Sequence, residues 1–232
     1  MHYNNTIKAT FHSRPNRFIA NVYINNQLEI VHVKNTGRCK ELLFPGAQVI
    51  LEKSDNPDRK TKYDLVGVCK EGIGLINMDS QAPNKVVWEW LTANDNKTTT
   101  PFKNITHIKP ECTFGSSRMD FYFEYDGRKA FMEVKGVTLE RGGIGYFPDA
   151  PTERGIKHLN ELISAVQQGY EAYLAFVIQI PGVKVVYPNV DKHKAFADAY
   201  EKAYQSGVKV LFLQCGITED ELWIENYSEK EI

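Results

Sequence analysis

The chain has 232 residues, of which 42% are hydrophobic and 12% aromatic, and its formal net charge is −1. This length suits one compact unit or two modest domains with a sizeable core. No run approaches the ~18 uncharged apolar residues of a membrane span, so we expect a soluble protein with no membrane partner. The first six residues lack the basic and apolar regions of a secretory signal, which predicts a cytoplasmic location.

Charge is unevenly distributed along the chain. Residues 1–45 contain six basic side chains against two acidic ones, whereas residues 216–232 contain six acidic side chains against one lysine. A basic N-terminal surface and an acidic tail sum to near neutrality while the first still attracts phosphate. The net charge therefore does not exclude a nucleic-acid partner.

The first 80 residues read as short strands separated by turn signals, without a helical period. Asn25-Asn26 favours a tight hairpin, because asparagine tolerates positive φ. Several short strands in so few residues predict a small barrel of the OB (oligonucleotide/oligosaccharide-binding) type, which often presents a face to nucleic acid. The predicted strands are 7–12, 17–24, 28–34, 48–53, 64–70 and 73–78.

In a hairpin with a two-residue turn at Asn25-Asn26, the numbers of two paired residues add up to 51. This register places Arg17 opposite Lys34. Two facing cations repel, so either both side chains bend apart into water or they share an anionic ligand. The adjoining loops add further donors at the same end of the hairpin. Guanidinium and ammonium groups suit phosphate oxygens, and the predicted contacts are Arg14, Arg17, Lys34, Arg38 and Lys40.

Residues 79–111 form the predicted junction, with a short helix at 86–93 and an exposed loop at 94–101. The pattern then becomes mixed α/β, with strands at 117–125, 129–135, 172–180 and 208–213 and helices at 153–168 and 192–205. The stripe of Ile156, Leu159, Ile163 and Val166 supports the first of these two helices. This order predicts a sheet flanked by helices, and hence a barrel domain at 1–80 followed by an α/β domain at 81–232.

The most informative stretch is the run 118–135, in which Asp126-Gly127 separates two alternating segments. Asp-Gly is a strong hairpin signal, and a two-residue turn pairs positions that sum to 253. Asp120 then faces Glu133. Like charges ~5 Å apart destabilise a strand pair unless a divalent cation lies between them, and Mg²⁺ prefers such oxygen ligands.

Lys135 lies two residues after Glu133 and points to the same face. Arg118 lies opposite it and is a further predicted nucleic-acid contact. An acidic pair beside a cation suits metal-dependent hydrolysis of a phosphodiester, in which the lysine stabilises the transition state or orients water. The alternative is an exposed strand face with ordinary ion pairs. The other face of the hairpin is predicted to be buried, and it carries Met119, Phe121, Phe123, Ala130, Met132 and Val134.

The glycine-rich segment 142–149 is expected to be a long loop beside this site. It leads into the helix that carries Arg154 and Lys157, whose side chains are predicted to reach a phosphate. His158 follows on the same helix and is expected to be a surface histidine rather than a general base.

Several motifs together resemble the sugar fermentation stimulation protein family over nearly the whole chain. They are Arg14-Pro15-Asn16-Arg17-Phe18, Asn35-Thr36-Gly37-Arg38, Ser117-Arg118-Met119-Asp120-Phe121, Glu133-Val134-Lys135 and the run from Gly145 to Gly155. The resemblance implies DNA binding, an OB-like N-terminal domain and a restriction-endonuclease-like C-terminal domain similar to the PD-(D/E)XK nucleases. It further implies that Asp120 and Glu133 bind Mg²⁺ or Mn²⁺ and that Lys135 is catalytic. A further upstream acid would be Glu89 or Glu111.

Three functions therefore compete. The first is a Mg²⁺-dependent nuclease that contacts DNA mainly through its backbone. The second is a non-catalytic DNA-binding regulator of sugar utilisation, although no helix-turn-helix is evident. The third is an RNA-binding protein, because OB-like barrels often bind single strands. A homo-oligomer is compatible with each.

Overall fold

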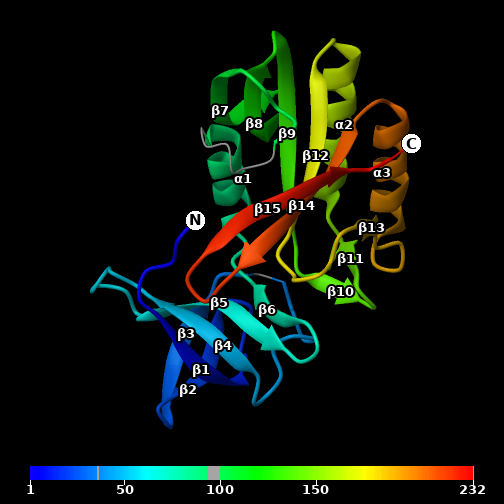
Figure 1. Cartoon of the computed structure of the whole chain (residues 1–232). Coiled ribbons are helices and arrows are strands. Elements are labelled where there is room, and N and C mark those ends of the chain that lie inside the picture. The colour runs from blue at the N-terminus through cyan, green and yellow to red at the C-terminus, as the bar shows by residue number, and fades with distance from the viewer. Residues whose placement is uncertain (36, 94–99, 232) are drawn as a thin grey trace.

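The computed structural model describes residues 1–35, 37–93 and 100–231. Most of the loop predicted at 94–101 therefore lies outside the described residues. The chain forms a barrel from its first third and a larger α/β domain from the remainder (Figure 1). None of the described helices is long and apolar enough to cross a membrane.

The N-terminal domain is a closed five-stranded barrel extended by a sixth strand, as predicted. Its strand order is β3-β2-β1-β4-β5-β6, and pairing of β3 with β5 closes the barrel. The fold is that of an OB domain, and the inner face is apolar because alternate residues point inward. The strands are β1 (Thr6–Ser13), β2 (Ile19–Ile24), β3 (Gln27–Val33), β4 (Gln48–Lys53), β5 (Tyr63–Lys70) and β6 (Gly74–Asn77).

The β2–β3 hairpin has the predicted register. Asn25 and Asn26 both have positive φ, at 49° and 65°, and the strands pair from Ile24 with Gln27 to Ile19 with His32. Each pair sums to 51, so the two-residue turn fixes the pairing.

The C-terminal domain contains a six-stranded sheet in the order β15-β14-β12-β9-β8-β7. Helix α1 packs on one face and helices α2 and α3 on the other, which confirms the predicted sheet flanked by helices (Figure 1). The strands are β7 (Ile105–Phe114), β8 (Ser117–Tyr125), β9 (Arg128–Val137), β12 (Glu171–Ile178), β14 (Lys209–Ile217) and β15 (Leu222–Glu229). The helices are α1 (Ala82–Thr92), α2 (Glu153–Gln167) and α3 (Lys194–Gln205).

The prediction of a long loop at 142–149 is wrong. Gly142 and Gly143, with φ of 62° and 82°, form the turn of a hairpin between β10 (Leu139–Arg141) and β11 (Ile144–Phe147). The glycines mark a turn because they adopt positive φ without steric cost. A short strand, β13 (Val186–Pro188), pairs with β11 and completes a three-stranded sheet beside the barrel.

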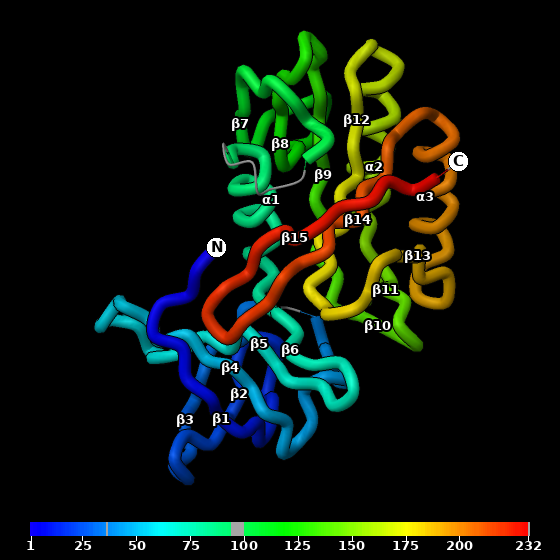
Figure 2. Tube along the Cα trace, viewed as in Figure 1, coloured from blue at the N-terminus to red at the C-terminus, as the bar shows by residue number. Residues whose placement is uncertain are grey.

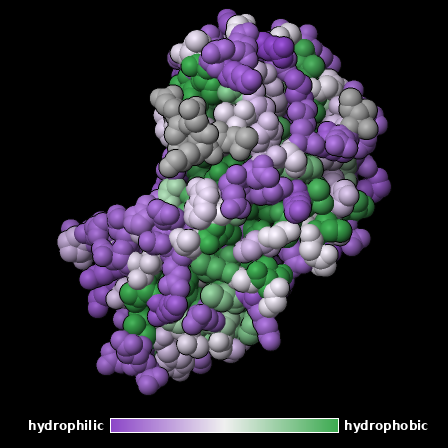
Figure 3. Space-filling model, viewed as in Figure 1, coloured by the Kyte–Doolittle hydropathy of each residue, from purple (hydrophilic) through white to green (hydrophobic). Residues whose placement is uncertain are grey.

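The chain ends hold the two domains together. The backbone amide of Tyr3 donates to the Asp220 carbonyl at 2.7 Å, and His2 bridges to Glu221, so the N-terminus lies beside the β14–β15 hairpin (Figure 2). Hydrophobic residues gather in the middle of the molecule in this view, where the barrel meets the C-terminal domain (Figure 3).

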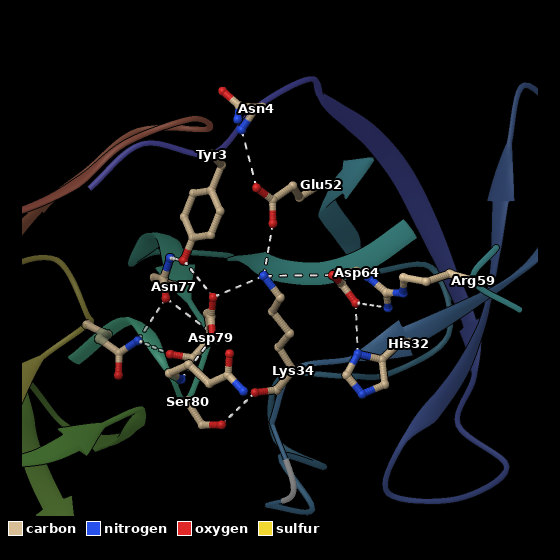
Figure 4. A network of polar contacts seen from close by, with 12 residues as sticks. Tyr3, Asn4, His32, Lys34, Glu52, Arg59, Asp64, Asn77, Asp79 and Ser80 are labelled. Atoms are coloured by element: carbon tan, nitrogen blue, oxygen red, sulfur yellow. Dashed lines mark hydrogen bonds and ion pairs between the residues drawn. The ribbon is translucent and has the colours of Figure 1, made fainter. Parts of the chain in front are cut away.

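A buried polar network adds to this junction (Figure 4). The Asn77 amide donates to the Tyr3 hydroxyl at 2.8 Å, and the Gln179 amide at the end of β12 donates to Asn77 Oδ1 at 2.7 Å. Asp79 and Lys34 lie in the same network (Figure 4). Because these groups come from both domains, the network fixes their relative orientation.

The structure corrects the expected role of Lys34. Its ammonium lies 2.9 Å from Glu52, 3.5 Å from Asp79 and 3.8 Å from Asp64, so it points toward carboxylates of the barrel (Figure 4). Lys34 therefore neither bends into water nor is free to bind a phosphate, because its charge is paired within the protein.

Candidate metal centre and nucleic-acid interface

The β8–β9 hairpin places two carboxylates together. Asp126 and Gly127 have φ of 45° and 73°, and the strands pair from Tyr125 with Arg128 to Phe121 with Met132. These pairs sum to 253, which confirms the predicted register over that range. One position further, the Asp120 side chain accepts a hydrogen bond from the Val134 amide at 2.7 Å.

Asp120 is held from two sides. Its Oδ2 accepts the Val134 amide, and its Oδ1 accepts a 2.8 Å hydrogen bond from the Asn84 amide in the first turn of α1. Burial raises the pKa of the Asp120 carboxyl, and the nearby charge of Glu133 raises it further. Each carboxylate oxygen has two lone pairs, so Asp120 retains acceptor capacity for a cation.

Glu133 is a buried charge, with only 2% of its surface exposed. Its Oε1 accepts hydrogen bonds from Lys135 and from His158. Its Oε2 is also buried and has no hydrogen-bond partner among the described residues. Burial alone would raise the pKa of Glu133, but the bonds from His158 and Lys135 outweigh it, so the pKa lies below its ordinary value.

His158 is not the surface histidine that we expected, since it is only 4% exposed. Its Nε2 accepts a hydrogen bond from Arg154 Nε at 3.3 Å, and an arginine nitrogen can only donate. The proton of a neutral imidazole therefore lies on Nδ1, which donates to Glu133 Oε1. His158 thus orients Glu133, and Arg154 orients His158.

Gly136 lets neighbouring groups approach closely just after Lys135. A Cβ at this position would lie 2.7 Å from Gln179 Oε1 and 2.7 Å from Pro83 Cγ. A larger residue would push Pro83 and the first turn of α1 away. Since Asn84 belongs to that turn, its contact with Asp120 depends on this close packing.

The predicted phosphate-binding residues lie in different environments. Arg14 donates to four backbone carbonyls, those of Arg17, Asn35, Gly37 and Arg38, at 2.6–2.8 Å. Its terminal nitrogens thus tie the two barrel loops together rather than facing a phosphate.

Three more of these residues also have protein partners. Arg118 lies 3.0 Å from Glu111, Arg154 contacts His158, and Lys157 donates to the Ser116 carbonyl at 2.7 Å. The Arg118 side chain thus forms an ion pair with a residue of β7.

Arg17, Arg38 and Lys40 are exposed. The Arg17 guanidinium lies 4.8 Å from the centre of the Phe18 ring. Arg38 and Lys40 line a cleft between the two domains. All three carry a positive charge that solvent reaches.

The upstream acid is assigned to neither candidate by these contacts. Glu89 lies 2.6 Å from the N-terminal ammonium, and Glu111 pairs with Arg118.

Two residues of the site were not predicted from the sequence. Asn84 was missed because an asparagine near the start of a helix is typical of a turn. His158 could have been found, since it shares a buried face of α2 with Leu159 and Leu162.

The side chains present fit a hard divalent cation. No group of three or more His, Cys, Asp or Glu side chains arranged to hold a metal occurs in residues 1–35, 37–93 and 100–231. Mg²⁺, however, is commonly bound by one or two carboxylates together with waters and substrate phosphate. Asp120 and the buried Oε2 of Glu133 supply that number of oxygen ligands.

The fold and this geometry define a class of two-domain proteins, in which an OB barrel precedes an α/β domain with paired carboxylates and a lysine. Family models support this division: residues 13–78 match the SfsA N-terminal OB domain, and residues 81–221 match the sugar fermentation stimulation protein RE domain. The chain belongs to the sugar fermentation stimulation protein (SfsA) family.

Relatives with this description match nearly the whole chain. The sugar fermentation stimulation protein homolog of Desulfitobacterium hafniense strain Y51 is 55% identical, over 96% of this chain and 94% of its own. The Clostridium beijerinckii homolog is 52% identical, over 98% of both chains. A solved structure, Pyrococcus furiosus SfsA in complex with Ca²⁺, is 26% identical with a TM-score of 0.78, over 95% of this chain and 94% of that one.

Proposed function

We propose that this chain is a DNA-binding, metal-dependent nuclease that hydrolyses phosphodiester bonds at Asp120, Glu133 and Lys135. The observation that carries the proposal is the buried Glu133 Oε2, which lacks a partner among the described residues. Glu133 is also close enough to Asp120 for its charge to raise the pKa of that carboxyl. An unpaired buried carboxylate oxygen is costly, and a divalent cation removes that cost.

Two further observations support the proposal. The solved Pyrococcus furiosus SfsA is a complex with Ca²⁺, an ion that takes oxygen ligands as Mg²⁺ and Mn²⁺ do. The strand arrangement of Asp120, Glu133 and Lys135 also resembles the site of PD-(D/E)XK nucleases. On this basis Mg²⁺ or Mn²⁺ is the proposed cofactor.

Each residue has a distinct role in the proposed reaction. When bound, the cation supplies an activated water and neutralises charge on the scissile phosphate. Asp120 and Glu133 hold it, while Asn84 and His158 orient these two carboxylates. Lys135 keeps its proton on Nζ and donates a hydrogen bond to the charge that develops on the phosphate. The Lys135 ammonium contacts Glu133 and its side chain is partly exposed, so it lies next to the cation site that we propose.

The test is cleavage by the purified full-length chain. Linear, circular and single-stranded DNA, and RNA, are incubated with Mg²⁺, with Mn²⁺ or with a chelator. We expect cleavage that requires metal and falls about 100-fold or more in Lys135→Ala, since one transition-state contact has this value. Lys129→Ala, an exposed lysine on the same strand, is the matched control and should cleave normally.

Two results would overturn the proposal. One is the absence of cleavage under every metal condition, which would favour the non-catalytic DNA-binding regulator. The other is metal-dependent cleavage that is equal in Lys135→Ala and in the control, which would locate the reaction elsewhere.

A further inference from the structure

A cleft of about 610 Å³ lies between the barrel and the C-terminal domain. One wall is the barrel segment 38–41. The other wall is formed by β10, the segment 149–151 after β11, and Lys192 ahead of α3. Four basic side chains line it: Arg38, Lys40, Arg141 and Lys192.

The charge of this cleft favours an anion. Its acidic lining residues are Glu41, Glu140 and Asp149. Glu140 already accepts hydrogen bonds from Lys70 at 2.9 Å and from the Gly143 amide at 2.7 Å. The Gly143 and Lys70 contacts hold the pKa of Glu140 below its ordinary value, so it stays a partnered carboxylate. Four cations then face two other carboxylates, which suits a phosphate backbone.

A second cavity adjoins this cleft. A smaller cavity of about 190 Å³ shares the lining residues Leu139 and Asp149 with it. This cavity reaches Gly136, the residue directly after Lys135. Strand β9 therefore carries both a wall of the smaller cavity and the residues of the proposed reaction centre.

The smaller cavity has the lining that a nucleobase requires. The Arg141 guanidinium lies 5.3 Å from the centre of the Tyr146 ring, so a flat, positively charged platform stands where the two cavities meet. Bases stack on such aromatic rings. Asn35, Ser80 and Thr138 line the same cavity and provide amide and hydroxyl groups for base edges.

The size of these cavities distinguishes a single strand from a duplex. Sites of roughly 300–1,000 Å³ hold small ligands, and the larger cleft lies in that range. A duplex, whose major groove alone is about 12 Å wide, is too large to enter either cavity. The polar network across Asn77 and Gln179 joins the same two domains, so the walls are fixed before a ligand arrives (Figure 4).

We propose that this interdomain cleft binds single-stranded nucleic acid, with Arg38, Lys40, Arg141 and Lys192 on the phosphates and a base stacked on Tyr146. The proposal rests on the proposed nuclease function and names its substrate as a single strand. Arg141, Lys192 and Tyr146 are binding residues that sequence reasoning did not identify.

The test measures binding rather than cleavage. Labelled single-stranded and duplex DNA of equal length are titrated in chelator, and affinity is read by fluorescence anisotropy at several salt concentrations. We expect the double variant R141A/K192A to bind the single strand about 10-fold or more weakly, with a salt slope lowered by about 1.4. The control K129A/K202A removes two exposed lysines outside the cleft and should stay within about 2-fold of the wild type.

A third variant tests the base platform. Tyr146→Ala should weaken single-strand binding about 10-fold, the lower range of one lost stacking contact, while duplex binding changes less. All variants are first checked for an unchanged thermal unfolding midpoint. Tyr146→Phe keeps the ring, and it should restore binding if stacking rather than the hydroxyl group is responsible.

The outcomes separate this proposal from the nuclease proposal. Equal weakening by R141A/K192A and by the control would overturn the cleft, as would duplex binding that matches single-strand binding, or no binding at all. If R141A/K192A weakens binding but no metal supports cleavage, the cleft stands and the nuclease fails. If Lys135→Ala loses cleavage and R141A/K192A binds normally, the nuclease proposal stands and the cleft proposal fails.

Discussion

Among the described residues, two clusters of charged side chains contain buried carboxylates, and they differ in how completely their charges are paired. At the domain junction, the single ammonium of Lys34 faces the carboxylates of Glu52, Asp64 and Asp79. In the C-terminal sheet, Glu133 accepts hydrogen bonds from Lys135 and His158, and its charge acts on the nearby Asp120 carboxyl. The first cluster is bonded throughout, whereas Glu133 Oε2 has no partner within the described part of the chain.

The difference indicates which cluster is structural. Buried charges that only hold a fold tend to be paired and hydrogen-bonded, because an unpaired one costs several kcal/mol. An oxygen left without a partner at a buried site is therefore informative, since folding alone gives no reason for it. The Lys34 cluster belongs to the domain junction, and the unpartnered oxygen of Glu133 is the reason that we propose a ligand-binding role for the other cluster.

The largest effect that we expect on stability is in the Lys34 cluster. The Lys34 side chain is only 16% exposed, and Lys34→Met would leave three carboxylates without their common cation. Breaking such a cluster should lower the free energy of unfolding by about 3 kcal/mol, measured by urea denaturation. Lys53→Met, an exposed lysine on β4, is the control. A loss below about 1 kcal/mol, the value of a surface pair, would show that the cluster is not structural.

A smaller effect, with a pH signature, concerns Arg59, which binds both oxygens of Asp64 at 2.7 and 2.8 Å. Burial alone would raise the pKa of Asp64, but the bonds from Arg59 and His32 outweigh it and lower the pKa. A lowered carboxyl pKa adds stability above the unfolded value of about 3.9, and that stability is lost as pH falls through the folded pKa.

Arg59→Ala should therefore cost about 1 kcal/mol at pH 7, and the difference from the wild type should shrink as pH falls below about 4. The measurement is the urea midpoint at a series of pH values. The neighbouring exposed Lys60→Ala should change neither the urea midpoint at pH 7 nor its dependence on pH. A difference between Arg59→Ala and the wild type that is constant with pH would show that the arginine acts through packing rather than through Asp64.

The smallest expected change in the free energy of unfolding is an increase rather than a decrease. Asp120→Asn removes the like-charge repulsion with Glu133, and a turn of the Asn84 amide can keep both hydrogen bonds. The metal-free variant should be as stable as the wild type or more stable by about a few tenths of a kcal/mol. Because most substitutions destabilise, this sign is informative. Strong destabilisation in urea would instead make Asp120 a structural partner like those around Lys34.

Local signals account for what the sequence predicted correctly. The turns at Asn25-Asn26 and Asp126-Gly127 fix the register of two hairpins, because a two-residue loop leaves one pairing scheme. The edge strand β7 was missed because its residues are mostly exposed and it contains Pro110, so no clear alternation appears. Strand β15 was read only as an acidic tail, although Leu222 and Ile224 alternate with exposed residues.

The partners of the charged side chains could not be read from the sequence. Lys34 meets Asp79, and Glu133 meets His158, only after distant elements pack together. Arg14 looked like a phosphate ligand because residue type does not reveal that its donors are used by nearby carbonyls. Register is a local property, whereas the satisfaction of a charge depends on the whole fold.

The proposed chemistry depends above all on Asp120 and Glu133 forming one divalent-cation site. The most direct test is calorimetric titration of Mn²⁺ into the chelator-treated full-length chain, into D120N and into E133Q, with D198N on the surface of α3 as control. We expect saturable binding by the wild type and the control, and loss of that binding in both site variants. Binding that survives in D120N and E133Q, or no binding by the wild type, would contradict a cation site at this pair.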